Sequence, residues 1–305
     1  MVDPGPILDG NVPIAVLDPF RVVNRALLDL LRTFSKEEWH APTVHADRSV
    51  KDLVAHLIHG SLRRVTALRD RYHAPAPRLS SHEELTAFIQ ADNRAFMEGM
   101  KRISPEVLTE LAERYDIQLL LLLEALEPKA DGLGVVWAGE WTSKNWFDVA
   151  REYTEKWHHQ QQLRDATGRP PLYEPALLVP VLETFARGFP YAYRALDYPE
   201  ATALVIRIAG PVSLCWVVRR EALDGSSDAA RTEREAMPPS QSRPTPRGGS
   251  GRKACPLPPL RRGAKSMGTP DSPLLSSASW LSWRNHPGHR CCPHHRSSRC
   301  VHCPN

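Results

Sequence analysis

Apolar residues recur at helical spacing along most of the first 195 residues of the chain. A side chain that returns every three or four positions lies on one face of a helix, and this pattern is typical of amphipathic helices that pack together. The spacing predicts helices over 19–34, 50–70, 81–100, 105–126, 143–166 and 175–194, the last one interrupted or kinked near Pro180 and Pro190. The chain is therefore predicted to be mainly α.

Local signals mark where several of these helices begin. Ser35 is followed three residues later by Glu38, and Ser81 by Glu84, which is the capping-box pattern. Proline follows Asp18 and Ser104, as at the first position of a helix. We expect Thr142 and Ser143 to cap the helix over 143–166.

The period of the pattern changes after residue 200. Leu204, Ile206 and Ile208 alternate with other residues, and Leu214, Trp216 and Val218 alternate again after a Gly-Pro turn. This pattern predicts one β-hairpin, which by itself is marginal in water. We interpret it as the beginning of an α+β domain.

Composition changes once more in the last third. Residues 237–305 hold twelve Pro, eleven Ser and six Gly, with one Val and no Ile, Phe or Tyr. Such a segment buries little apolar surface, so we expect disorder. The predicted organisation is a flexible leader over 1–17, a helical bundle over 18–198, a partial α+β domain over 199–223 and a disordered tail over 224–305. A frameshift in a GC-rich coding sequence is our hypothesis for the tail.

Charge and cysteine content limit the function classes. Residues 237–305 hold eleven Lys and Arg against one Asp, a local charge of about +10. Since the whole chain has a net charge of +4, the first 236 residues carry a charge of about −6. A basic surface for nucleic acid is therefore not expected on the body of the protein. No secretory signal is visible, and the longest apolar run, Leu119–Leu123, is too short to span a bilayer. Only Cys215 lies in the body, which suits a reducing compartment, so we predict a cytoplasmic protein.

Two of the predicted helices carry a candidate metal site. Glu155 and His159 are four residues apart and so lie on one face of a helix, and His56 on the helix over 50–70 can face them. Two imidazoles and one carboxylate suit a divalent metal such as zinc and leave a fourth position open. Each residue also has an ordinary interpretation: His56 as a partly buried histidine, and Glu155 with His159 as a surface pair.

The neighbours of these residues have predicted roles of their own. His59 can line a pocket, and His158 is interpreted as an ordinary polar residue. Gln162, three residues after His159, is a candidate hydrogen-bond partner of a ligand, although a solvated helix face is an equal interpretation for the run Gln160–Gln162. The bulky side chains on the same helix are predicted to be core: Trp146, Tyr153 and Trp157.

The two motif helices resemble a known family. Asp52-Leu-Val-Ala-His56-Leu and Glu155-Lys-Trp-His-His159-Gln-Gln-Gln-Leu-Arg-Asp-Ala-Thr-Gly-Arg-Pro resemble the signature helices of the DinB-like metalloprotein superfamily. The N-terminal domain of mycothiol-dependent maleylpyruvate isomerases is the most similar branch. The resemblance covers about residues 15–195, with 203–220 similar to the start of the family's C-terminal domain. It implies a four-helix bundle with His56, Glu155 and His159 as ligands of a divalent metal, usually zinc.

The resemblance also implies chemistry with a low-molecular-weight thiol such as mycothiol. A thiolate that adds to an electron-poor double bond lets that bond rotate, and elimination then gives the isomer; if the thiol stays attached, the reaction is an S-transfer. We therefore predict a metal- and thiol-dependent isomerase or transferase acting on a small electrophile. The family supplies an active-site arginine from its C-terminal domain, and we assign it to no position here. The alternative is a non-catalytic metal-binding or stress-associated bundle, and either protein could be a homodimer.

One further motif lies in the tail. Cys291, Cys292, His294, His295, Cys300, His302 and Cys303 are close in sequence and could nominally bind zinc. The segment between them offers no apolar packing for a zinc module. We interpret this motif as incidental.

Overall fold

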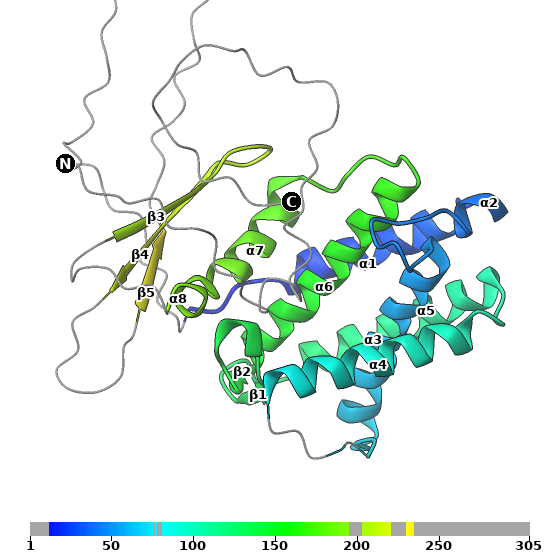
Figure 1. The fold of residues 1–305 in the computed structure, drawn as a ribbon, viewed down its shortest axis with the longest axis horizontal. Coiled ribbons are helices and arrows are strands. Elements are labelled where there is room, and N and C mark those ends of the chain that lie inside the picture. The colour runs from blue at the N-terminus through cyan, green and yellow to red at the C-terminus, as the bar shows by residue number, and fades with distance from the viewer. Residues whose placement is uncertain (1–11, 76, 78–80, 195–202, 221–229, 235–305) are drawn as a thin grey trace, which may run out of the picture. The chain divides into compact units, whose positions relative to one another are not determined.

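The computed structural model describes residues 12–75, 77, 81–194, 203–220 and 230–234. Four long helices form a bundle, in which the first two along the chain each pack against the last two (Figure 1). In chain order they are α1 (Leu17–Leu31), α3 (Val50–Arg69), α5 (Pro105–Glu124) and α6 (Asn145–Ala166). The predicted mainly α fold with a four-helix bundle is confirmed.

Four further helices complete the helical part. The short α2 (Lys36–Trp39) precedes α3, α4 (His82–Met100) packs on α3, and α7 (Pro175–Ala186) packs on α6, followed by α8 (Phe189–Ala192). Pro180 lies inside α7, and the interruption predicted near Pro190 falls at Arg187 and Gly188, between α7 and α8.

Side-chain caps set where the helices begin. At α2 the predicted capping box is present, with Ser35 accepting from the Glu38 backbone N–H and Glu38 accepting from the Ser35 backbone N–H. Ser81 and Ser104 cap α4 and α5, each accepting from the backbone N–H three residues on. A full capping box also opens α3, between Ser49 and Asp52. This box fixes the first turn of the helix that carries His56.

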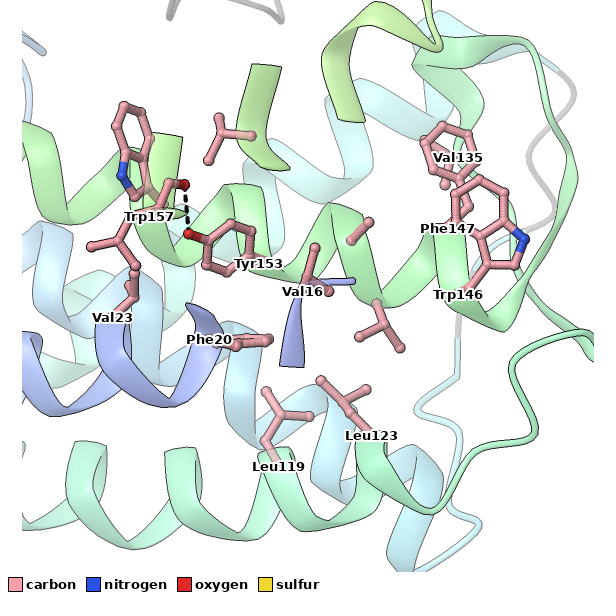
Figure 2. Packing of buried hydrophobic residues seen from close by; sticks show 14 of the residues in the cluster. Val16, Phe20, Val23, Leu119, Leu123, Val135, Trp146, Phe147, Tyr153 and Trp157 are labelled. Atoms are coloured by element: carbon pink, nitrogen blue, oxygen red, sulfur yellow. Dashed lines mark hydrogen bonds between the residues drawn. The ribbon is translucent and has the colours of Figure 1, made fainter. Parts of the chain in front are cut away.

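The core around α6 is aromatic (Figure 2). The rings of Phe20 and Tyr153 meet edge to face with centroids 5.7 Å apart, and both side chains are fully buried. The Tyr153 hydroxyl donates to the Leu177 carbonyl at 2.7 Å, and the Trp157 indole N–H donates to the Leu172 carbonyl at 3.0 Å. The prediction that Trp146, Tyr153 and Trp157 are core residues is confirmed, and they hold α6 against α1 and α7.

Part of the predicted leader belongs to this core. Val16 is 2% exposed and packs in the cluster with Phe20, and α1 already begins at Leu17. The expectation of a loose segment up to residue 17 is therefore wrong for Val16 and Leu17. Both residues pack against the apolar core of the bundle. The prolines that precede them in the sequence led us to begin the helix two residues later.

The start of α6 also differs from the prediction. Thr142–Lys144 forms a strand, β2, which pairs antiparallel with β1 (Asp131–Leu133) across a 3₁₀ turn (Val136–Ala138). The helix begins at Asn145, and its N-cap, Lys144, makes no side-chain cap. Ser143 is instead buried, and its hydroxyl accepts from the Val135 backbone N–H at 2.9 Å. The Ser143 hydroxyl, which we expected to cap the helix, is thus engaged in a tertiary hydrogen bond instead.

The hairpin predicted after residue 200 is present. β3 (Ala203–Ile208) pairs antiparallel with β4 (Leu214–Arg220), and Ile206 lies opposite Trp216. Trp216 is fully buried against Ala186 and Phe189. A third strand, β5 (Ala230–Arg234), pairs with β4, so the sheet continues past residue 223, where we expected it to end. Backbone pairing to β4 forms this strand, and its polar side chains carry no strand pattern.

Because β5 lies within the tail predicted over 224–305, the expectation of disorder is wrong for residues 230–234. The rest of the tail, with the frameshift hypothesis and the cysteine-histidine motif, lies outside the residues that the structure describes. Among the described helices, none is long and apolar enough to cross a membrane.

Candidate metal centre

The three predicted site residues come together between α3 and α6. His56 lies in the second turn of α3, and Glu155 and His159 lie one turn apart on α6. One nitrogen of each imidazole and one carboxylate oxygen all lie within 4.8 Å of one another. The Nε2 of His159 is 3.3 Å from Oε2 of Glu155, and the rings of His56 and His159 meet edge to face with centroids 4.7 Å apart.

The site is buried on one side and open on the other. His159 is buried and His56 is half-buried, whereas the side chain of Glu155 keeps 50% of its surface exposed. The polar end of the triad is therefore reachable from solvent.

The protonation states suit a cation. Burial, followed by the neighbouring charge of His159, lowers the pKa of His56 to about 3, so its imidazole is neutral at pH 7. The protein that surrounds the inner half of the Glu155 side chain keeps water from it, which opposes ionisation, but the hydrogen bond from His159 and the charges of His159, Arg151 and His56 outweigh this and lower the pKa of the carboxyl. A neutral imidazole and an ionised carboxylate are the forms that bind metals.

The donor set passes a simple test of fit for a divalent metal. Two ligands of one tetrahedral zinc, each about 2.1 Å from it, lie about 3.4 Å apart, which is close to the 3.3 Å between His159 and Glu155. Nδ1 of His56 is buried and has no hydrogen-bond partner among the described residues. Such a group is costly unless something binds it. His56, Glu155 and His159 are thus the residues that would hold the ion.

Comparison with known families bears on this segment of the chain. Residues 20–164 match the sequence model of the mycothiol maleylpyruvate isomerase N-terminal domain, which covers just under half of the chain. Residues 20–164 are therefore similar to this family. The match includes both helices of the triad and confirms the resemblance seen in the two signature motifs.

Solved structures and curated proteins add little to this. Two crystal structures of the mycothiol-dependent maleylpyruvate isomerase, one of them a mutant, are similar at 13% and 14% sequence identity. Each comparison covers 64% of this chain and 76% of the solved chain, with TM-scores of 0.45 and 0.42. No curated protein matches the chain.

Within the family segment, the residues around the triad depart in part from their predicted roles. His59 contacts α4: its Nδ1 is 3.0 Å from Oδ1 of Asn93, and its ring stacks on Phe96. Gln162 contacts His159, with Oε1 2.8 Å from Nδ1. The glutamine run is not a solvated face, because Gln160 is fully buried and Gln162 is 8% exposed.

Two buried ionic clusters join the helices of the triad, and neither was predicted. In the two turns of α6 that precede Glu155, Asp148 accepts from Arg64 of α3 at 2.6 Å. Arg151 donates to Asp148 and Glu152 at 2.7 Å each. On the core side of α6, Lys156 donates to Asp116 of α5 and Ser61 of α3. The only sequence signal was charge at positions of α6 that a buried helix would fill with apolar residues.

Proposed function

We propose that this chain is a divalent-metal-dependent enzyme that uses a low-molecular-weight thiol, such as mycothiol, in an isomerase or S-transferase reaction of the maleylpyruvate isomerase type. One observation carries the proposal: His56, Glu155 and His159 converge inside a segment that matches the sequence model of the mycothiol maleylpyruvate isomerase N-terminal domain.

The residues of the triad would act together as the metal site. His56 and His159 would supply neutral nitrogen donors and Glu155 a carboxylate oxygen. A bound divalent ion such as zinc lowers the pKa of a coordinating thiol and so makes a thiolate available at neutral pH. The exposed side of Glu155 leaves the site open to a small thiol and a small electrophile. The packing of α6 around Tyr153 and Trp157 would hold two of the three donors in place.

Several finer points belong to the same proposal. The physiological metal is proposed to be zinc on the chemistry of the donors. A cytoplasmic location, the absence of nucleic-acid partners, the division into a bundle over 18–198 with a partial α+β domain, and a possible homodimer all stay predictions.

Metal content of the purified full chain tests the site. Since the cysteines of the tail could bind zinc themselves, every protein carries Cys300→Ser and Cys303→Ser. We expect about one divalent ion per chain in this background, lost in His56→Ala and in His159→Ala, and retained in His73→Ala, a control at an exposed histidine. A folded background protein with no bound metal after incubation with zinc would refute the metal site.

Activity separates the enzyme from its rival, a non-catalytic metal-binding bundle. Conversion of maleylpyruvate is followed with and without mycothiol, before and after treatment with a chelator. We expect turnover that needs both the thiol and the metal and that disappears in His159→Ala. Stoichiometric metal with neither thiol-dependent isomerisation nor S-transfer would favour the non-catalytic bundle.

A further inference from the structure

Arg48, in the loop that precedes α3, is a largely buried cation without a close acidic partner. Its side chain is 13% exposed, and the nearest carboxylate among the described residues is that of Asp47, at 3.9 Å, which is too long for a hydrogen bond. Nε of Arg48 is buried and has no hydrogen-bond partner among those residues. Because a guanidinium stays protonated in proteins, it cannot avoid the cost of burial by losing its charge. A group of this kind is expected to meet an anion.

The other buried arginines near the triad are neutralised by carboxylates. Arg64 is 8% exposed and donates to Asp148 at 2.6 Å. Arg151 is 22% exposed and donates to Asp148 and Glu152 at 2.7 Å each. Both also have a buried Nε without a hydrogen-bond partner among the described residues, so the missing carboxylate, and not Nε alone, distinguishes Arg48 from them.

The loop that carries Arg48 is held in one shape. The backbone N–H and the hydroxyl of Thr43 both donate to the Arg48 carbonyl, at 3.2 and 2.8 Å, and the Arg48 backbone N–H donates to the His45 carbonyl at 3.2 Å. The loop ends at Ser49, the N-cap of α3. The guanidinium is held from α4, where Nη2 donates to Oε1 of Gln90 at 3.4 Å. An anion that binds Arg48 would therefore have little chain to order.

His45 of the same loop adds a second donor and links the loop to α6. Its Nε2 is buried and has no hydrogen-bond partner among the described residues. Burial, followed by the charges of Arg48 and His159, lowers the pKa of His45, and a hydrogen bond with Gln162 of α6 opposes this shift. Burial, and then the charges of His159 and Arg48, lower the pKa of His56. The loop is thus close enough to act electrostatically on both histidines of the triad.

The chemistry of these two groups suits a carboxylate. A guanidinium presents parallel N–H groups that match the two oxygens of a carboxylate, and an imidazole N–H can donate to the same group. A carboxylate would give the buried cation a partner, whereas an uncharged molecule of the same shape would not. A small molecule held in this way by one end would have its remainder near the triad.

We propose that Arg48, together with His45, forms an anion subsite beside the triad that binds the carboxylate of a small molecule and so selects anionic substrates. The selection of substrates rests on the proposed function, because it needs a reaction at the triad. The binding of the carboxylate does not, because Arg48 and its surroundings are present in the metal-free chain.

The first test measures carboxylate binding by isothermal titration calorimetry. The metal-free full chain is used, because a carboxylate could also bind a metal directly. Succinate is the probe, and succinamide is its uncharged counterpart. We expect succinate to bind about 10- to 100-fold more tightly than succinamide, and Arg48→Met to lose about the same factor, as for a hydrogen-bonded charged group. Arg48→Lys keeps the charge without the paired N–H groups and should fall between the two, as should His45→Leu.

Arg63→Met is the matched control. Arg63 also lies 3.9 Å from a carboxylate, that of Asp92, but its side chain is 51% exposed. This variant should leave the affinity for succinate unchanged. Equal losses in Arg63→Met and Arg48→Met would show a general effect of net charge and overturn the subsite. A wild type that binds succinate no better than succinamide would overturn it as well, and this outcome does not depend on any variant folding.

The second test identifies the reactant that carries the carboxylate. In the maleylpyruvate assay, a KM of Arg48→Met that rises for the electrophile alone assigns the subsite to the electrophile, and one that rises for the thiol alone assigns it to the thiol. Unchanged KM values for both would overturn the role in substrate selection. Succinate binding through Arg48 in a chain without turnover would support the subsite while the proposed function fails. Turnover in a chain whose succinate affinity ignores Arg48→Met would support the proposed function and overturn the subsite.

Discussion

The buried pair of Lys156 and Asp116 offers a sharp test of how the bundle holds the candidate site together. Lys156 lies on α6 directly after Glu155, and its ammonium donates to Oδ1 of Asp116 at 2.5 Å and to the Ser61 hydroxyl at 2.9 Å. Ser61 also donates to Oδ1 of Asp116 at 2.6 Å. The side chains of Lys156 and Asp116 are only 5% and 1% exposed. These contacts tie α3, α5 and α6 together.

The perturbation is Lys156→Met, which keeps the length of the side chain and removes the charge. Asp116 would then keep only the Ser61 hydroxyl, because its Oδ2 has no hydrogen-bond partner among the described residues. Leaving one charge of a buried pair alone costs about 3–5 kcal/mol, out of a total stability of about 5–15 kcal/mol for a typical domain. We expect the free energy of unfolding to fall by that amount.

Urea denaturation of the full chain, followed by helical circular dichroism, measures the loss. The double variant Lys156→Met with Asp116→Leu removes both charges, and it should recover most of the stability, because replacing a buried ion pair by apolar groups is often neutral. Lys144→Met is the control: Lys144 pairs with Asp131 at 2.6 Å, but the two side chains are 53% and 70% exposed. That variant should cost less than about 1 kcal/mol.

Two results would refute this reasoning. A loss below about 1 kcal/mol in Lys156→Met would mean that the pair behaves like a surface pair. A double variant as unstable as the single one would mean that packing, and not the unpaired charge, causes the loss.

Three further predictions follow from individual contacts. Tyr153→Phe removes the hydrogen bond from the buried hydroxyl to the Leu177 carbonyl, so it should cost about 1 kcal/mol in the same urea assay; no measurable change would mean that water replaces the bond. Ser49→Ala removes half of the capping box of α3 and should cost about 1 kcal/mol, while Ser49→Asp should restore most of it, and equal losses in both would contradict the capping role. The metal-free protein should lose stability as the pH falls. Burial lowers the pKa of both His56 and His158 in the folded chain to about 3, whereas a histidine in the unfolded chain has a pKa of about 6.5. The unfolded chain therefore takes up protons first. Stability from this source is complete above about pH 6.5 and is lost toward pH 3, about 2 kcal/mol per histidine between pH 7 and pH 5; replacing either residue with glutamine should flatten the profile, and an unchanged slope would contradict the assignment.

The sequence by itself determined the elements that depend on local pattern. Apolar spacing located the four bundle helices to within a few residues at each end, since a helix face repeats every three to four positions whatever it packs against. Ser35 and Glu38 gave the capping box for a similar reason, because both partners lie within one turn. Glu155 and His159 lie on one face by helical geometry alone.

The tertiary structure decided everything that joins distant segments. That His56 meets His159 depends on how α3 packs beside α6, and helical spacing within either segment does not contain that information. Ser143 became part of a strand because its hydroxyl found the Val135 backbone, and Val16 became core because the bundle covered it. The polar residues of α6 acquired partners on other helices, which made a helix of weak apolar pattern the most buried one in the site. Contacts between residues far apart in sequence arise only when the chain is folded, and these contacts turn two ordinary helices into a candidate metal centre.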